Sequence, residues 1–153
     1  MALTSHVLSQ HNFQVEYGTT SIPNVRKVGE ISDETDTLRW GEGAVKVGDP
    51  FQRHGLTKTN NIRIERYLDA KDNALRDIWK KLRDGATTED LEQPLVVQLI
   101  NENVGAKKVQ FEITLHNAWI CKYGITELDA HSKGTVMEYA EFAGEHLQVK
   151  KGA

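Results

Sequence analysis

Histidine, cysteine and carboxylate side chains are the groups in this sequence that could bind a metal ion or act as a nucleophile, acid or base. The histidines stand at six positions: His6, His11, His54, His116, His131 and His146. Their spacing contains no HExxH motif and the chain has no CxxC motif, so the sequence predicts no metal site. His116 and Cys121 could be imagined as a nucleophile pair, but nothing beyond their presence supports one.

Carboxylates are plentiful but scattered along the chain. Glu138, Glu141 and Glu145 lie on one predicted strand, where residues three apart point to opposite faces and cannot form a catalytic pair. The acidic run between residues 89 and 92 is typical of a solvated loop. The chain also has no P-loop, no GxGxxG motif after a strand and no GxSxG motif. We therefore predict a protein that is not an enzyme, with no catalytic residue and no cofactor.

The composition favours one folded domain. With 153 residues, of which 39% are hydrophobic and 27% charged, the chain can build one modest core. The formal net charge of -3 lacks the basic excess that neutralises phosphates, which disfavours a nucleic-acid partner. The lone Cys121 cannot form an intramolecular disulfide and is expected to pack as a small apolar side chain. No leader-like start and no span of about 20 apolar residues is present, which predicts folding in the cytoplasm.

The first half of the chain contains strands and one long glycine-rich segment. The polar character of residues 1–12 indicates a mobile arm. Alternation of apolar and polar residues predicts strands over 13–17 and 25–31, and the second of these is expected to contain a bulge near Gly29. Residues 34–60 predict an extended loop or hairpin in which only 44–47 can form strand. Such a long segment is uncommon unless it is functional. Its apolar and glycine positions are candidate interface residues: Trp40, Gly41, Gly43, Val45, Val47, Phe51, Gly55 and Leu56.

One convincing helix is predicted over 70–84, after a strand at 60–68. Asp69 or Asp72 can cap its N-terminus, and Gly85 can take the left-handed conformation that ends it. Apolar residues recur at helical spacing and form one stripe, which predicts a face packed on the core. The stripe consists of Leu75, Ile78, Trp79 and Leu82.

The second half predicts strands that carry apolar groups on both faces. The stretch 110–116 alternates, with Phe111, Ile113 and Leu115 on one face; the polar face carries Gln110, Glu112, Thr114 and His116. After Asn117 the phase of the alternation slips. The strands at 94–100 and 135–149 also offer apolar side chains to both sides. Either the sheet is sandwiched within the monomer, or another subunit covers its second face.

Several segments together resemble the tail tube protein family of contractile phage tails and related contractile injection systems. The resemblance rests on Asn117-Ala118-Trp119, on Leu128-Asp129-Ala130 and on the block 138–147, preceded in order by the segments 55–58 and 62–66 and by a helix with Leu and Trp. It extends from about residue 13 to 149. The sequence departs from the family pattern at Gly144 and His146, where the family often has His and Gly.

The resemblance implies a mainly β, α+β domain over 13–149, followed by a short tail at 150–153. Two antiparallel sheets would pack as a barrel-like sandwich with one flanking helix, six copies would close into a ring, and rings would stack into a hollow tube. Residues 34–60 would form the loop between rings, and Gln110, Glu112, Thr114 and His116 would line the lumen if the apolar face of their strand meets the core.

The implied role is mechanical. A contracting sheath would drive the tube from a baseplate through a target envelope, and DNA or effector protein would pass through its lumen. The implied partners are thus other copies of the chain, the sheath, the baseplate and the cargo, in a particle assembled in the host cytoplasm. Two alternatives are a tube-initiating or baseplate paralogue of the same fold, and a small-ligand-binding β-barrel, which would need a concave apolar pocket.

Overall fold

The computed structural model describes residues 12–40, 51–85, 91–103 and 106–151, and strands dominate this part of the chain. The strands are β1 (Phe13–Tyr17), β2 (Thr20–Ile22), β3 (Val25–Val28), β4 (Asp33–Trp40), β5 (Phe51–Thr59), β6 (Ile62–Tyr67), β7 (Gln93–Asn103), β8 (Ala106–Ile125), β9 (Met137–Ala143) and β10 (His146–Lys151). The helix α1 is Ala74–Arg83. Every strand pair among the described residues is antiparallel, which confirms the mainly β fold with a flanking helix.

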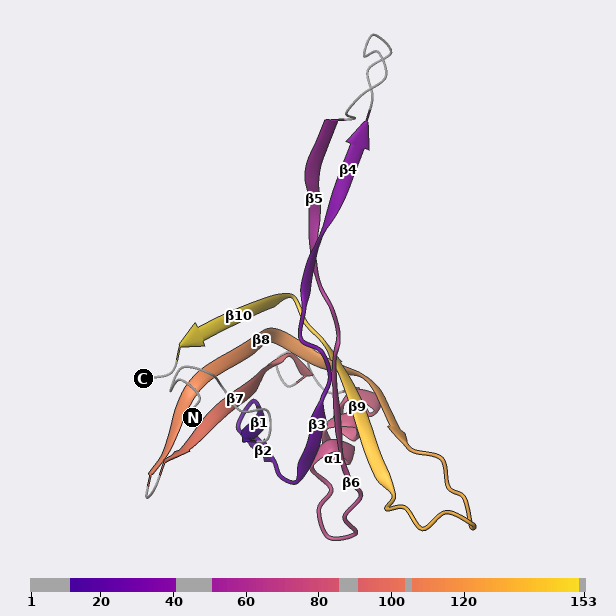
Figure 1. Cartoon of the computed structure of the whole chain (residues 1–153). Coiled ribbons are helices and arrows are strands. Elements are labelled where there is room, and N and C mark those ends of the chain that lie inside the picture. Colours follow the sequence, from indigo (N-terminus) through magenta and orange to yellow (C-terminus); the bar gives the residue numbers. More distant parts are fainter. Residues whose placement is uncertain (1–11, 41–50, 86–90, 104–105, 152–153) are drawn as a thin grey trace.

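The strand β8 connects the two predicted sheets. Its first part pairs with β7 and β10 and completes the sheet β2-β1-β7-β8-β10, called sheet A from here on. Its last part pairs with β9 and completes the sheet β8-β9-β6-β3, called sheet B. Figure 1 shows β8 curving from one sheet into the other. The two sheets of the sandwich are therefore two arms of one bent sheet.

The bend lies at Asn117, where the sequence shows the phase slip. Asn117 has a φ of 51°, in the left-handed region that asparagine tolerates better than most residues. Leu115 pairs with Leu95 while Ala118 pairs with Gln93, so β8 carries one residue more than β7 at this point. As a result Leu115, Ala118 and Ile120 all point into the core.

The core lies between the inner faces of sheets A and B, and α1 packs against β8 and β2. Its buried apolar side chains are Val15, Tyr17, Ile22, Ile62, Ile64, Leu75, Ile78, Leu95, Val97, Leu115, Ala118, Ile120, Ala140 and Phe142. The Tyr17 hydroxyl bonds the backbone oxygens of Leu91 and Ala118, which satisfies this polar group inside the core. Sandwiching within the monomer thus accounts for the apolar inner faces of both sheets.

The helix is shorter than the predicted range 70–84 because Asp72, before its first turn, binds Arg66 and the Ala74 amide. Asn73 is the N-cap residue but its side chain makes no capping hydrogen bond; instead, Asp72 Oδ1 accepts from the Ala74 amide at 3.0 Å. Gly85 follows the helix with a φ of 77°. In the apolar stripe Leu75 and Ile78 are buried, and Trp79 and Leu82 pack against the core.

Residues 34–60 are more regular than the sequence suggested. The expectation that only 44–47 can form strand is wrong for the flanking residues, because β4 and β5 pair with each other along 33–40 and 51–59. Threonine and charged residues, not apolar alternation, support this hairpin: Thr59 donates to Asp33 and Lys58 approaches Glu34. A register shift lies opposite Gly55 and Leu56. Residues 44–47 themselves lie outside the described part of the chain.

Two other strand predictions need correction. The bulge expected near Gly29 lies earlier, between Val25 and Lys27, and β3 ends at Val28. The last predicted strand, 135–149, is divided into β9 and β10, which both pair with β8 along the same edge. The interruption falls at Gly144 and Glu145, opposite the bend of β8, because both strands must turn together where sheet A meets sheet B.

Candidate assembly surfaces

The β4–β5 hairpin projects far from the rest of the molecule (Figure 1). In the described residues its two strands pair only with each other. Its base is fixed where Asn60 donates to the backbone oxygen of Ser32 at 3.1 Å and to the Ser32 hydroxyl at 2.8 Å. Leu56 on this hairpin is 82% exposed. A projecting two-stranded ribbon is marginally stable alone, so this one is suited to contact another molecule.

The structure describes the backbone of four of the predicted interface residues of this segment. Gly55 and Leu56 lie at the register shift of β5, and Trp40 pairs with Phe51 at the last described position of the hairpin. The side chains of Trp40 and Phe51 are not described. Gly41, Gly43, Val45 and Val47 lie outside the described residues.

The outward face of sheet A is mostly polar. The register aligns Gln14, Gln98, Glu112 and Lys150 in one row across β1, β7, β8 and β10. A second row contains Glu16, Val96, Thr114 and Gln148, and His116 pairs with His146 in a third. We call these residues the polar face. Its opposite side carries Val15, Val97, Leu95 and Leu115, which are buried in the core.

The predicted lumen residues divide on this surface. Glu112, Thr114 and His116 belong to the polar face, whereas Gln110 lies at a register shift of β8 and does not continue a row. On the other side of the strand, Leu115 is buried and Ile113 packs against the core. Phe111, the third residue of the predicted apolar face, is half-buried.

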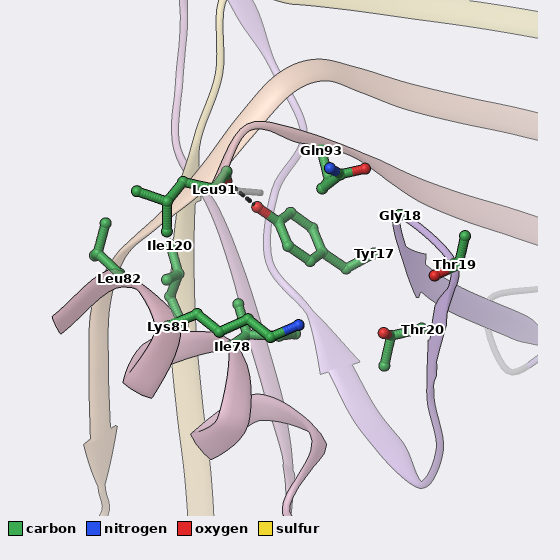
Figure 2. A pocket seen from close by; sticks show the side chains of 10 residues that line it. All are labelled: Tyr17, Gly18, Thr19, Thr20, Ile78, Lys81, Leu82, Leu91, Gln93 and Ile120. Atoms are coloured by element: carbon green, nitrogen blue, oxygen red, sulfur yellow. Dashed lines mark hydrogen bonds between the residues drawn. The ribbon is translucent and has the colours of Figure 1, made fainter. Parts of the chain in front are cut away.

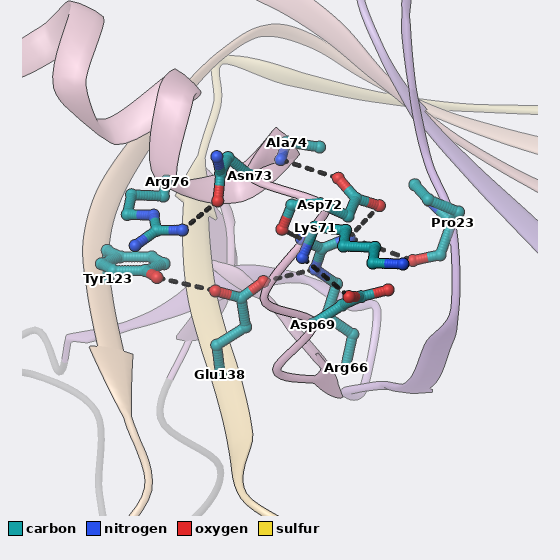
Figure 3. Close-up of polar contacts among 10 residues, drawn as sticks. All are labelled: Pro23, Arg66, Asp69, Lys71, Asp72, Asn73, Ala74, Arg76, Tyr123 and Glu138. Atoms are coloured by element: carbon teal, nitrogen blue, oxygen red, sulfur yellow. Dashed lines mark hydrogen bonds and ion pairs between the residues drawn. The ribbon is translucent and has the colours of Figure 1, made fainter.

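A buried polar cluster ties sheet B to the start of α1 (Figure 3). Arg66 donates through Nε to Glu138 Oε1 at 2.5 Å and through Nη1 to Asp72 Oδ2 at 3.0 Å. It also donates to the backbone oxygens of Pro23 and Asp72. Tyr123 donates to Glu138 Oε2 at 2.7 Å. This cluster holds five segments of the chain together: the β2–β3 turn, β6, the helix start, β8 and β9.

Electrostatic shifts in this cluster follow from its contacts. Burial alone would lower the pKa of Arg66, but the hydrogen bonds and charges of Asp72 and Glu138 raise it. The Ala74 amide and Arg66 lower the pKa of Asp72. Burial, together with the hydrogen bond to Glu138, raises the pKa of Tyr123 to about 12. The charged forms of Arg66 and Asp72 and the neutral form of Tyr123 are thus favoured, which suits a structural role.

No sequence motif marks this cluster. The two charged residues do, however, stand at positions of their strands that face inward. Arg66 follows Ile62 and Ile64 with the same two-residue spacing, and Glu138 precedes Ala140 and Phe142 in the same way. A charged residue in the inward phase of a strand requires a partner. Only the β6–β9 register, in which Arg66 pairs with Glu138, shows which partner each one has.

A cavity of about 260 Å³ lies between α1 and the β1–β2 turn (Figure 2). Tyr17 and Lys81 lie on its two sides, and Ile78 and Ile120 contribute apolar wall. The Tyr17 hydroxyl is already engaged by two backbone oxygens. Ligand pockets usually measure about 300–1,000 Å³ and have convergent polar groups. This cavity therefore gives little support to a ligand-binding β-barrel.

Cys121 is exposed, which corrects the expectation that it packs as an apolar side chain. A register shift between Ile120 and Lys122 turns it away from the core, and its thiol donates to the Glu141 backbone oxygen at 3.3 Å. His116 instead contacts Gln148 and His146. Within the described residues, no group of three or more potential metal ligands is found. No helix among them is long and apolar enough to span a membrane.

Comparison with known proteins identifies this architecture. Among solved structures, a chain from the structure of the PVC sheath/tube terminator, part of an extracellular contractile injection system, is similar, with a TM-score of 0.79, 16% identity, and 97% of this chain and 99% of that chain covered. A chain of the PVC sheath-tube complex has a TM-score of 0.73, 17% identity, and coverage of 97% and 94%. A chain of the 6-fold symmetrised anti-feeding prophage baseplate has a TM-score of 0.75, 17% identity, and coverage of 96% and 97%.

No curated protein sequence matches the chain. The sequence itself nevertheless carries a family signature over nearly its whole length. Residues 9–148 match the family model described as T4-like virus tail tube protein gp19. This match and the shared fold confirm the resemblance noted in the sequence. The chain therefore belongs to the tail tube protein family of T4-like viruses.

Proposed function

We propose that the chain forms hexameric rings that stack into the inner tube of a contractile phage tail or contractile injection particle. The observation that carries this proposal is sheet A, which has one face packed on the core and one face that is mostly polar. If the sheets A of six copies join through their edge strands β2 and β10, they form a closed barrel without free edges. The similarity to a chain of a 6-fold symmetrised baseplate supports six copies.

In this arrangement the polar face lines the lumen. It extends the lumen residues predicted from β8, which include Glu112, Thr114 and His116, to three neighbouring strands. The described rows carry two acidic residues, Glu16 and Glu112, and one basic residue, Lys150, so both signs of charge are present with a small acidic excess. A polar wall of mixed charge suits a conduit, because a passing DNA or effector protein is not held tightly.

The β4–β5 hairpin is the proposed contact between stacked rings. It is the part of the described structure that reaches farthest from the core, and exposed Leu56 offers an apolar side chain to a neighbour. A contact that repeats by translation between copies builds an open-ended assembly. The proposed N-terminal arm, residues 1–12, lies almost wholly outside the described residues. Of the predicted tail, Lys150 and Lys151 belong to β10, and residues 152–153 lie outside the described part of the chain.

The remaining proposed partners are a sheath around the tube and a baseplate on which it begins. The named similar structures support them, since one is a sheath-tube complex and another a baseplate. The proposed assembly takes place in the host cytoplasm before the particle acts. The role is structural and involves no enzymatic step.

A second candidate is a paralogue of the same fold that forms a single ring at one end of the tube. Similarity to chains from the structures of a sheath/tube terminator and of a baseplate supports it. Such a protein would share the lumen-forming sheet, but no further ring of the same chain could stack on at least one side of its ring.

Negative-stain electron microscopy of the purified chain across a concentration series tests both candidates. We expect hollow filaments from a tube subunit and isolated rings from a terminal paralogue. Replacing Leu56 with Ser should shorten or abolish filaments while rings persist, and the matched control Leu56→Met should assemble normally because it keeps an apolar side chain. Monomers at every concentration would contradict both candidates, and filaments of unchanged length from Leu56→Ser would contradict the role of the hairpin.

A further inference from the structure

Two imidazole rings lie against each other on the polar face. His116 on β8 and His146 on β10 are directly opposite in the register of the two strands. Their ring centroids are 5.6 Å apart and the rings are inclined by only 19°. His146 is exposed and His116 is half-buried, so solvent reaches the pair. Imidazole is the commonest protein ligand for transition metals.

The backbone around this pair is fixed by the bend between the two sheets. The Glu145 amide donates to the His116 backbone oxygen at 3.1 Å, and Asn117 Nδ2 donates to Glu145 Oε2 at 2.9 Å. Gly144 lies directly against the Leu115 side chain. The two histidines therefore project from paired strands and not from a loop, which reduces the entropy lost when both bind one ligand.

A third side chain orients one of the rings. Gln148, two residues after His146 on the same strand face, accepts a hydrogen bond from His116 Nε2 through Oε1 at 2.7 Å. With the proton on Nε2, the lone pair of the neutral ring lies on Nδ1. Histidines that ligate metals typically donate their other N–H to a carbonyl or carboxylate in this way. The arrangement thus resembles the surroundings of a metal-binding histidine.

We propose that His116 and His146 together bind one divalent transition-metal ion of the class that imidazole prefers, namely Ni²⁺, Cu²⁺ or Zn²⁺, with Gln148 as a positioning residue. His116 binds through Nδ1, and the exposed ring of His146 turns out of the stacked arrangement so that its lone pair, which lies in the plane of the ring, reaches the same ion. Solvent takes the remaining coordination positions. The site requires only one folded chain. It is therefore independent of tube assembly, although a ring of six copies would place six such pairs on the proposed lumen.

Equilibrium dialysis of the untagged full-length protein against Ni²⁺ tests this site, because it works for monomers, rings and filaments alike. We expect His116→Ala and His146→Ala each to weaken the tightest binding by at least about tenfold. His131→Ala, which removes an exposed histidine elsewhere, should leave the affinity unchanged. His146→Asn provides a second variant that keeps a polar side chain of moderate size, and it should lose binding as His146→Ala does.

The role of Gln148 has a test of its own. Gln148→Leu should weaken Ni²⁺ binding by about tenfold, whereas Gln148→Glu should match or exceed the unaltered protein because a carboxylate accepts the Nε2 proton more strongly. In a nuclear magnetic resonance titration, paramagnetic Ni²⁺ should broaden the ring signals of His116 and His146 first. Equal affinity in the unaltered protein and the double variant His116→Ala/His146→Ala would overturn the proposal, as would initial broadening at another histidine.

Discussion

Arg66 and Glu138 form an ion pair that is shut off from solvent, since Arg66 is 0% exposed and Glu138 is 1% exposed. They lie opposite each other on β6 and β9, with Nε 2.5 Å from Oε1. The remaining donors of Arg66 hold Asp72 and the backbone oxygen of Pro23. One guanidinium thus connects two strands, the helix start and the β2–β3 turn (Figure 3).

Removing one member of this pair should be costly. Arg66→Met leaves Glu138 buried without its cation, and the free energy of unfolding should fall by about 3–5 kcal/mol. Urea unfolding followed by circular dichroism measures it. The control is Arg63→Met on the outer face of the same strand, where the side chain is 39% exposed and pairs with Glu65. That change should cost no more than about 1 kcal/mol.

The double variant Arg66→Met/Glu138→Leu sharpens the same test. If the cost of Arg66→Met comes from the uncompensated carboxylate, the second change should recover part of the stability, because a well-packed apolar pair can replace a buried ion pair. Equal losses for Arg66→Met and Arg63→Met would contradict the structural role of the cluster.

The raised pKa of Tyr123 predicts a loss of stability at alkaline pH. The hydroxyl titrates at about 12 in the folded chain, because of burial and the bond to Glu138. In the unfolded chain it titrates near its ordinary value of about 10. A raised folded-state pKa means that the contribution to stability is complete below the unfolded value and is lost as pH rises through the folded value.

Tyr123→Phe should therefore show a smaller decline in stability between about pH 10 and pH 12 than the unaltered protein. At pH 7 it should be less stable by about 1–3 kcal/mol, because Glu138 Oε2 loses its donor. Chemical unfolding at a series of pH values measures both effects. Tyr67→Phe, at a more exposed position of β6, is the matched control and should keep the decline. An unchanged decline in Tyr123→Phe would argue against this assignment.

The bend between the sheets depends on the absence of a side chain at residue 144. A Cβ added to Gly144 would lie 2.5 Å from Cγ of Leu115, which is fully buried and cannot retreat. Gly144→Ala should therefore lower the unfolding free energy by about 1–3 kcal/mol. A Cβ at Gly124 would meet the hydroxyl end of Tyr139, a half-buried side chain that can move outward.

Gly124→Ala is thus the control and should cost less than Gly144→Ala in the same unfolding assay. The rotamers of Leu115 can be followed by its methyl signals in nuclear magnetic resonance spectra, which should shift in Gly144→Ala and remain in place in Gly124→Ala. If both variants keep the stability of the unaltered protein, the packing of Gly144 on Leu115 does not determine the bend.

The local pattern of apolar and polar residues was sufficient to predict some helices and strands. The alternation at residues 110–116 and the stripe of Leu75 and Ile78 record which side chains face the core, because an apolar face must repeat with the period of its element. The phase slip after Asn117 was also visible, and its cause is the bend of β8. A sequence pattern shows that such a slip exists but not which strands pair on either side of it.

Other features depend on contacts between distant residues and left weak local signals. The partnership of Arg66 with Glu138 requires the β6–β9 register. The β4–β5 hairpin is held by cross-strand pairs such as Thr59 with Asp33, so its strands show no apolar alternation. Cys121 is exposed because of a single register shift in β8. In each case the position of the side chain depends on which residues of two neighbouring strands lie opposite each other, and the sequence of one strand alone does not contain this register.

The assignment of the polar face to the lumen predicts a size-dependent protection of Thr114. In a Cys121→Ser background, the substitution Thr114→Cys places one thiol in the middle of the polar face, opposite Gln148. A small maleimide should label this thiol in assembled tubes and in dissociated protein. A maleimide carried on a large polymer should label only dissociated protein, because the polymer cannot enter a narrow lumen.

The control is Lys71→Cys, at an exposed position before α1 and off the polar face, which should react with both reagents in both states. Rapid labelling of Thr114→Cys by the large reagent in intact tubes would place the polar face outside the lumen.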